Sequence, residues 1–262
     1  MSGVLLFYKS DSGVIATGRL ESNGIFTQLA DGKLSDGWTH IVAVGRELLF
    51  YRGDNGVIAT GRLSSDGIFT QLADGKLNDG WTHIVALGRE LLFYRAVNGV
   101  IATGRLSSDG IFTGLAEGRL NAGWSHINDL GRELQFYRSD NGKISTGRLS
   151  TNGIFTGLAD GQLNAGWSHI NALGRELQFY RSDNGKISTG RINGNGIFTG
   201  LADGQLNAGW SHINDLDREL QFYRSDNGKI STGRIDTNGI FTGLADGQLN
   251  AGWKIITGVG VA

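Results

Sequence analysis

Five histidines at one recurring position are the residues best suited to catalysis or metal binding in this 262-residue chain. Each follows a serine or threonine, as in Ser125-His126, which looks like a nucleophile beside a base. Neighbours on a strand point to opposite faces, so we expect that these side chains cannot pair. Imidazoles spread over separate repeats are also too far apart for one metal ion. The sequence favours hydrogen-bonded histidines in the core or along a channel, with a sugar contact as the alternative. The positions are His40, His83, His126, His169 and His212.

A tryptophan and the polar segment before it form the second candidate site. A sugar packs a C–H face on an aromatic ring while its hydroxyls need polar partners, so this combination suits carbohydrate recognition. Burial of the ring in the core, with aspartate and asparagine acting only as turn formers, is the alternative. The candidate residues are Trp38, Trp81, Trp124, Trp167, Trp210 and Trp253; Asp31, Asp74, Glu117, Asp160, Asp203 and Asp246; and Asn78, Asn121, Asn164, Asn207 and Asn250.

Catalysis is not expected from this sequence. An enzyme needs one asymmetric constellation of groups, and no candidate group breaks the repetition in that way. Calcium binding through Asp160 and Asn164 lacks the necessary number of ligands. We therefore expect a protein that is not an enzyme, with no metal site and no cofactor.

The spacing of these residues predicts the architecture. The tryptophans recur every 43 residues, from Trp38 to Trp253, and six such copies account for nearly the whole chain. A period of 20 to 50 residues indicates a repeat protein. Within one copy, 38–44, 47–52, 57–63 and 68–72 are apolar or aromatic runs of strand length. Asn55-Gly56 and Asp66-Gly67 separate these runs and favour tight hairpins, since both central residues of a type I′ turn need φ > 0.

Four antiparallel strands per copy and six copies predict an all-β fold, a six-bladed β-propeller. The expected blades of this single domain are 38–80, 81–123, 124–166, 167–209 and 210–252, with a composite blade from 253–262 and 1–37. In the composite blade the C-terminal strand pairs with the N-terminal strands, which closes the ring and leaves no open edge. Two β-trefoils are the alternative, but the period continues unbroken through the middle of the chain.

Composition narrows the functional classes. The net charge is −1 and the pI is near 6.5, which argues against nucleic-acid binding and against anionic membranes. There is no cysteine. The beginning of the chain lacks the features of a signal peptide, and no apolar stretch is long enough to span a bilayer. We expect a soluble protein, plausibly monomeric, that is cytoplasmic or released without a classical signal.

One pattern resembles a known family. Gly166-Trp167-Ser168-His169-Ile170, followed by Leu177-Gln178-Phe179-Tyr180, is similar to the repeats of the tachylectin-2 and tectonin β-propeller lectins, and the similarity extends through the chain. This resemblance implies binding of carbohydrates, often N-acetylated or methylated sugars, at one site per repeat between blades. It also implies a role in innate defence or agglutination, with glycans on cell surfaces or glycoproteins as partners.

The sequence therefore predicts a multivalent lectin with five or six weak sites. Displaying several sites on one rigid face can raise avidity about 10²- to 10⁴-fold. A non-catalytic protein-interaction scaffold is the alternative, and an engineered or reconstructed symmetric propeller is compatible with such regular copies. A lectin must keep the polar residues of its long loop in every copy, whereas a scaffold need not.

Overall fold

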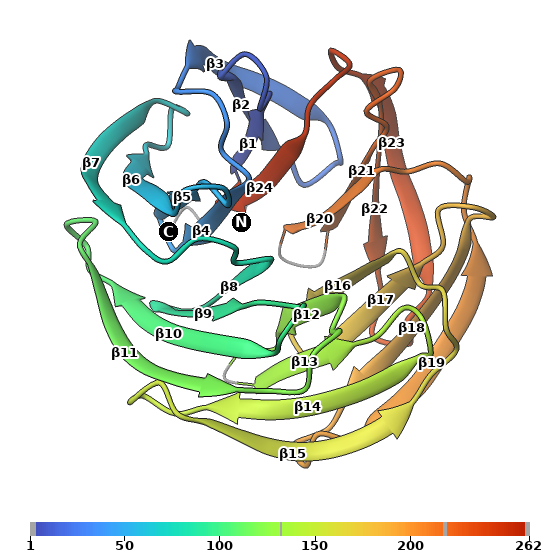
Figure 1. The fold of residues 1–262 in the computed structure, drawn as a ribbon. Coiled ribbons are helices and arrows are strands. Elements are labelled where there is room, and N and C mark those ends of the chain that lie inside the picture. Colours follow the sequence, from blue (N-terminus) through green and yellow to red (C-terminus); the bar gives the residue numbers. More distant parts are fainter. Residues whose placement is uncertain (1–3, 132, 217–218, 260–262) are drawn as a thin grey trace.

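The computed structural model describes residues 4–131, 133–216 and 219–259, which form six four-stranded antiparallel sheets. The sheets surround a common axis, and the first strand of each lies nearest the centre (Figure 1). This arrangement confirms the predicted six-bladed β-propeller and excludes a pair of trefoils. The described part of the chain contains no helix that is long and apolar enough to cross a lipid bilayer.

Five of the sheets are meanders that run in chain order from the innermost strand to the outermost strand, and the composite blade has the last strand of the chain innermost. The composite blade contains β24 (Ile255–Val259), β1 (Val4–Tyr8), β2 (Val14–Leu20) and β3 (Phe26–Lys33). The next two blades contain β4 (His40–Val44), β5 (Glu47–Tyr51), β6 (Val57–Leu63) and β7 (Phe69–Lys76), then β8 (His83–Leu87), β9 (Glu90–Tyr94), β10 (Val100–Leu106) and β11 (Phe112–Arg119). The fourth contains β12 (His126–Asp129), β13 (Glu133–Tyr137), β14 (Lys143–Leu149) and β15 (Phe155–Gln162). The last two contain β16 (His169–Leu173), β17 (Glu176–Tyr180), β18 (Lys186–Ile192) and β19 (Phe198–Gln205), then β20 (His212–Leu216), β21 (Glu219–Tyr223), β22 (Lys229–Ile235) and β23 (Phe241–Gln248).

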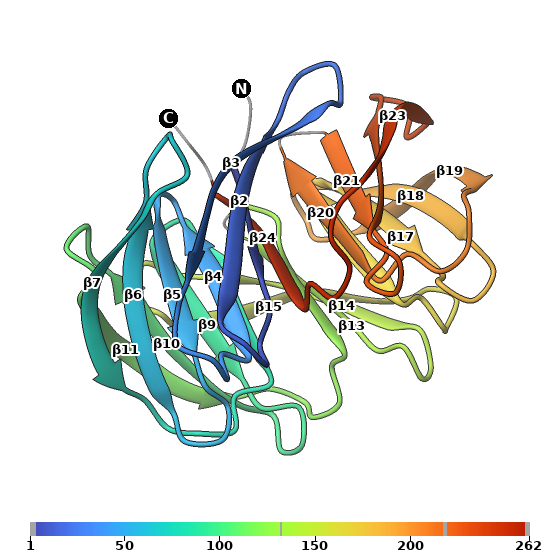
Figure 2. The same ribbon diagram turned by 90° about the horizontal axis from the view of Figure 1, so that it is seen from above.

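Strands from opposite ends of the chain close the ring. β24 pairs antiparallel with β1, with Ile255 opposite Tyr8 and Val259 opposite Val4. Figure 2 shows β24, in red, alongside the blue strands of the first blade. The composite blade predicted from the sequence is confirmed, and β1 has a partner along both edges.

Glycine at the first hairpin is required by close packing as well as by turn geometry. Gly56 has φ +73°, and a Cβ placed there would lie 2.1 Å from the carbonyl oxygen of Leu77. The Leu77 N–H donates to the Gly56 carbonyl at 2.8 Å. The hairpin and the long connection to the next blade are therefore held together on one face of the ring, as the alternation of strand directions predicts.

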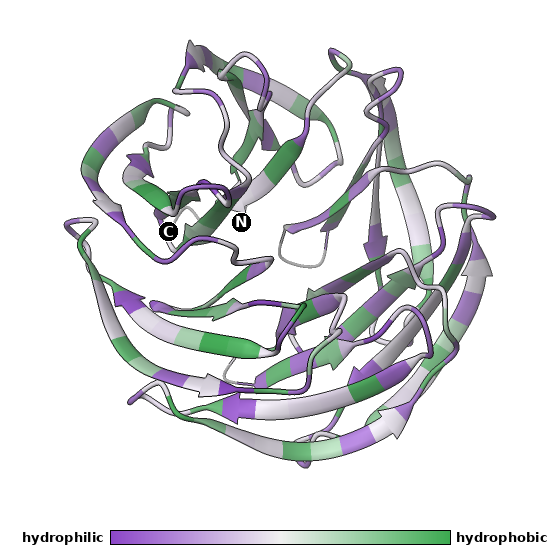
Figure 3. Cartoon of the chain, in the orientation of Figure 1, coloured by the Kyte–Doolittle hydropathy of each residue, from purple (hydrophilic) through white to green (hydrophobic). Residues whose placement is uncertain are grey.

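The core lies between neighbouring blades. All residues of β5 are buried, and the Phe50 ring meets Phe69 of its own blade edge-on, with centroids 5.3 Å apart. The Tyr51 hydroxyl donates to the Asn78 carbonyl and accepts from the Trp81 N–H, both at 3.1 Å. Figure 3 shows hydrophilic and hydrophobic bands alternating along the outer strands β7, β11 and β15. In burial, however, the strands differ as wholes: β5 is buried throughout, whereas every residue of β7 is exposed or half-buried.

The fourth strand of each blade is longer than predicted. The sequence predicts a strand at 68–72 followed by a loop, but β7 continues to Lys76. A register shift between Thr60 and Gly61 lets pairing resume beyond the expected end, with Asp74 opposite Ala59. The acidic candidates consequently lie on the outer strand and not in the connecting loop.

Candidate functional site

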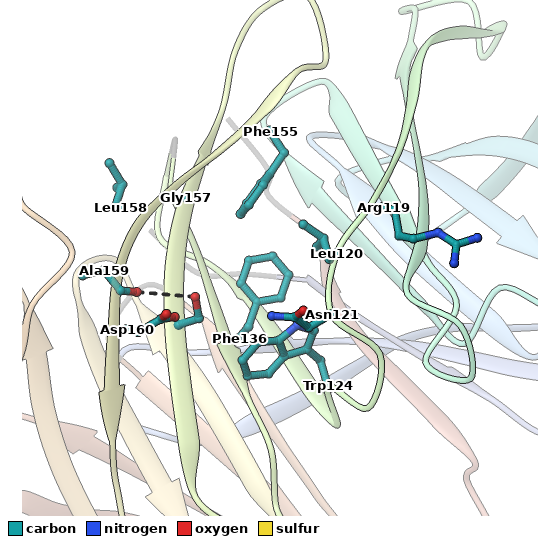
Figure 4. Close-up of a pocket in the computed structure, with 11 residues that line it drawn as sticks. Arg119, Leu120, Asn121, Trp124, Phe136, Phe155, Gly157, Leu158, Ala159 and Asp160 are labelled. Carbon is teal, nitrogen blue, oxygen red and sulfur yellow. Dashed lines mark hydrogen bonds between the residues drawn. The ribbon is translucent and has the colours of Figure 1, made fainter.

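A cavity of about 690 Å³ lies on the face of the fourth blade, beside the connection that enters that blade. Trp124, Phe136 and Phe155 line its floor. Figure 4 shows the Phe136 ring between the other two rings, with the Asp160 side chain on one side and the Asn121 side chain on the other. Asn121 and Trp124 come from the connection between β11 and β12, whereas Asp160 comes from β15. The fold thus brings an aromatic floor, a carboxylate and an amide together from segments distant in sequence.

The aromatic floor is rigid. Phe136 is 1% exposed and contacts Trp124 at a centroid distance of 5.7 Å and Phe155 edge-on at 5.4 Å. The Arg138 guanidinium lies over the Trp124 ring, 4.9 Å from its centroid. Since Trp124 is only 3% exposed, most of its surface already packs against protein. Phe155 is less buried and offers more ring surface to a ligand than the tryptophan does.

The Asp160 carboxylate of this cavity is free to meet a ligand. The Asp160 side chain is exposed, and it has no hydrogen bond or ion pair to any part of the chain that the structure describes. Ser145 lies opposite Asp160 across the strand pair and also lines the cavity. Arg119 extends away from the Phe136 ring (Figure 4). The cavity therefore offers strong hydrogen-bond acceptors beside apolar rings.

Equivalent cavities recur on two other blades. One of about 680 Å³ is lined by Trp81, Asn78 and Glu117 among others, and one of about 240 Å³ by Trp253, Asn250 and Asp31. The predicted tryptophan, asparagine and acidic positions are thus brought together at all three places. The combination of acidic residue and tryptophan in one cavity differs from the expected combination in a single respect. Asp160 shares a cavity with Trp124, 36 residues before it, and not with the nearby Trp167, because the outer strand carries Asp160 back across the blade.

The five histidines lie elsewhere, and none of them lines these three cavities. Each is on the innermost strand of its blade and faces the next blade. His126 Nε2 lies 3.1 Å from the Ser168 carbonyl oxygen of the next blade, and the equivalent contact recurs for His40, His83, His169 and His212. Burial lowers the pKa of each of these imidazoles. The role supported by this geometry is to connect neighbouring blades near the axis.

One expectation about the histidines is wrong. Ser125 Oγ lies 3.0 Å from His126 Nδ1, so the two side chains do pair. Ser125 precedes β12 and is not part of it, so the alternation of strand side chains does not apply. The hydroxyl also contacts the Tyr137 carbonyl and accepts from the Ser139 N–H. This network recurs in other blades and orients each imidazole toward the next blade.

Two carboxylates on innermost strands interrupt the repetition, and neither is among the candidates predicted from the sequence. Asp129 and Asp215 occupy the position held by alanine or glycine in the other copies. Burial, and secondarily the charge of Asp215, raises the pKa of Asp129 to about 7. Burial likewise raises the pKa of Asp215. Aligning the copies on their tryptophans and searching for differences would have identified this pair.

Comparison with known proteins identifies the fold. No family model matches the chain, and no curated protein matches it. Solved β-propellers are similar in structure. A candidate 6-phosphogluconolactonase from Bacteroides fragilis superposes with a TM-score of 0.68 at 11% identity, with 98% of each chain covered. The periplasmic gluconolactonase of Pseudomonas aeruginosa gives 0.68 at 14% identity over 100% of each chain. A chain of the nidogen–laminin complex gives 0.59 at 15% identity over 98% of each chain.

These similarities change two expectations. None of these three proteins is named as a lectin, so the kinship with tachylectin-2 is unsupported beyond the propeller fold. The expectation that the chain is not an enzyme is overturned, because proteins named as gluconolactonases share the architecture. That expectation rested on unbroken repetition, and Asp129 and Asp215 break it. At these identities the likeness itself shows the fold alone.

Proposed function

We propose that this propeller binds carbohydrate through the cavities on its blades and acts as a multivalent lectin. The supporting observation is the recurrence of one arrangement at three places: an aromatic floor with a carboxylate and an asparagine at its edges. A sugar packs its C–H face on phenylalanine, donates hydroxyl protons to the carboxylate and accepts from the amide. Each site is shallow and weak, so useful binding requires several sites on one glycan-bearing surface.

A broad glycan array with purified, labelled protein tests the proposal. We expect binding to glycans that share one terminal sugar, with competition by the free monosaccharide. N-Acetylated sugars are the first candidates because of the resemblance of the repeats to lectin repeats. A blank array from folded protein would contradict carbohydrate binding and direct attention to a protein-binding scaffold.

Removal of the asparagine side chains tests whether these cavities are responsible. The Tyr94 hydroxyl bonds the main-chain carbonyl of Asn121, so alanine at this position keeps that hydrogen bond. Alanine at Asn78, Asn121, Asn164, Asn207 and Asn250 together should abolish array binding while leaving the melting temperature nearly unchanged. A matched control replaces the exposed hairpin residues Asn152, Asn195 and Asn238 with alanine and should bind as the parent does. Equal binding by both variants would rule out the cavities.

A second candidate function is hydrolysis of a lactone near the axis. The observation favouring it is the Asp129 carboxyl group, whose pKa of about 7 suits a general acid or base at neutral pH. Similar propellers named as gluconolactonases suggest the substrate class. Acid release from 6-phosphogluconolactone should exceed the spontaneous rate and fall in D129N and D215N. A rate equal to the spontaneous one for the parent protein would dismiss this candidate.

A further inference from the structure

We infer that one residue on each outer strand decides whether the adjacent cavity admits a ligand, so that four blades carry open sites and two carry sites filled by the protein itself. This inference rests on the proposed function and specifies which of its sites work. The residue is the third of each outer strand. It is Gln28 or Gln71 in two blades, and glycine in the other four, at Gly114, Gly157, Gly200 and Gly243.

The glutamine side chain binds the carboxylate that a ligand would need. Gln28 Nε2 donates to Asp31 Oδ2 at 2.8 Å. Gln71 Nε2 lies 2.8 and 2.9 Å from the two carboxylate oxygens of Asp74. In the glycine blades the equivalent carboxylates have no such partner anywhere in the described ranges. These carboxylates are Glu117, Asp160, Asp203 and Asp246.

Cavity size follows the same division. The cavity beside Gln28 is about 240 Å³, whereas those beside Gly114 and Gly157 are about 680 and 690 Å³. A Cβ placed at any of the four glycines would meet nothing within 4 Å, so the space over them is open.

The opposite wall of the cavity comes from the neighbouring strand of the same blade. Ala16 and Ala59, in the glutamine blades, are each 9% exposed. The residues at the same position in the four glycine blades are all partly exposed. They are Ala102, Ser145, Ser188 and Ser231. Ala16 lies opposite Asp31, the carboxylate that Gln28 binds, whereas Ala102 lies opposite Glu117, which has no such partner in the described ranges.

The position of the glutamine amide defines the chemistry of the ligand. An amide N–H₂ group lies where a bound molecule would meet the carboxylate, so a ligand of the open cavities must bring hydrogen-bond donors to that point. Two adjacent hydroxyls or an acetamido N–H on a neutral sugar meet this requirement. The four open blades are consecutive, from the blade of Trp81 to that of Trp210, and the two closed blades are also neighbours, namely the composite blade and the blade of Trp38. Binding is therefore confined to one arc of the ring.

Cysteine labelling tests the access to the cavities without any sugar. The chain has no cysteine, so a single introduced thiol gives an unambiguous signal. We expect A102C to react with dithionitrobenzoate about tenfold faster than A16C, because thiol reaction requires access. Adding Q28G to A16C should raise its rate, and adding G114Q to A102C should lower its rate. Thermal unfolding of each variant checks that it is folded, and equal rates throughout would overturn the inference.

Counting bound sugars tests the same idea through ligand binding. Equilibrium dialysis with radiolabelled N-acetylglucosamine should saturate at four per chain. The Q28G/Q71G variant should bind six, and the variant with glutamine at all four glycine positions should bind none. Six sugars bound by the parent protein would refute the inference. No binding by any variant, together with the expected labelling rates, would instead refute carbohydrate binding and leave the access mechanism intact.

Discussion

The inner and outer halves of each blade differ in burial, and both contain positions that vary between copies. In the fourth blade every residue of β13 is buried, whereas every residue of β15 is exposed or half-buried. The inner half keeps its Phe-Tyr pair in all six copies. The outer half exchanges glutamine for glycine and aspartate for glutamate between copies.

This contrast indicates that one repeat divides two tasks between its strands. Buried aromatic rings and inter-blade hydrogen bonds near the axis supply stability, and each loss there leaves a cavity or an unpaired group. Outer-strand side chains can change without such penalties, so differences in recognition between copies are tolerated there. Substitutions in the inner half should therefore change melting temperature, and those in the outer half should change binding.

The largest effect is expected for Y137F. The Tyr137 hydroxyl donates to the Asn164 carbonyl at 2.8 Å and accepts from the Trp167 N–H at 3.3 Å. Its removal leaves buried main-chain groups unpaired, at a cost of about 1–3 kcal/mol. For a chain of this length, differential scanning calorimetry should show a melting temperature lower by about 3–8 °C. A change below one degree would mean that water replaces the hydroxyl and that the inner half is not dry.

A smaller loss is expected for H126I, a substitution that the sequence already contains at Ile255. The contacts of Nε2 with Ser168 and of Nδ1 with Ser125 disappear, at a cost of about 1–2 kcal/mol at pH 7.

The pH dependence of the melting temperature tests whether the stability lost in H126I comes from the neutral His126 imidazole. Burial lowers the imidazole pKa, so below pH 6.5 the unfolded chain binds protons that the folded chain does not. The parent should therefore lose stability on acidification from pH 7 to 5, and H126I should lose less. Parallel melting curves for the two proteins across this range would contradict the assignment.

The architecture was predictable because each repeat encodes it locally. Six blades follow from the period of Trp38 and its copies together with the Asn-Gly hairpins. The pairing of β24 with β1 that closes the ring follows from the offset of the two termini within the repeat. The length of the outer strand was not predictable, since Ala159-Asp160-Gly161 has the composition of a turn. Only the register shift beside Gly147 reveals that pairing continues.

The candidate site was predictable in residue types and less so in its assembly. Tryptophan, asparagine and carboxylate do meet, but Asp160 reaches the cavity of Trp124 through the long strand. Phe136 and Phe155 were not among the candidates, because sequence alone cannot distinguish a buried ring from the floor of a cavity. Asp129 and Asp215 were missed because the sequence analysis compared the positions that all copies share and did not examine the positions at which single copies differ.

A stabilising effect is expected for D129N. The folded pKa of about 7 lies above the unfolded value of 3.8, so the folded chain binds its proton more tightly. The stability from this group is present at low pH and is lost as pH rises toward 7 and above. Asparagine carries no charge and keeps the oxygen that accepts from the Gly131 N–H. D129N should melt about 2–4 °C above the parent at pH 8 and much closer to it at pH 5. Equal melting temperatures at pH 8 would mean that solvent stabilises the ionised carboxylate as well in the folded chain as in the unfolded chain.

The smallest change in stability, and the largest in binding, is expected for the outer half. Amides at Glu117, Asp160, Asp203 and Asp246 keep the shape of these side chains but remove the charge that accepts from a ligand. Exposed substitutions of this kind change stability by about 0.5 kcal/mol or less, so the melting temperature should stay within about two degrees. Binding of the sugar found on the array should weaken at least about tenfold, because charge-assisted hydrogen bonds are the stronger kind.

A matched control places the same change outside the cavities. Asp140, Asp183 and Asp226 are exposed on the first hairpins and line none of the three cavities. Amides at these positions should leave both melting and binding unchanged. If the hairpin substitutions weaken binding as much as the four cavity substitutions do, the negative charge of this face as a whole attracts the ligand. In that case the outer strands do not hold a defined site. If only the cavity set weakens it, recognition resides in the half of the blade that contributes least to stability.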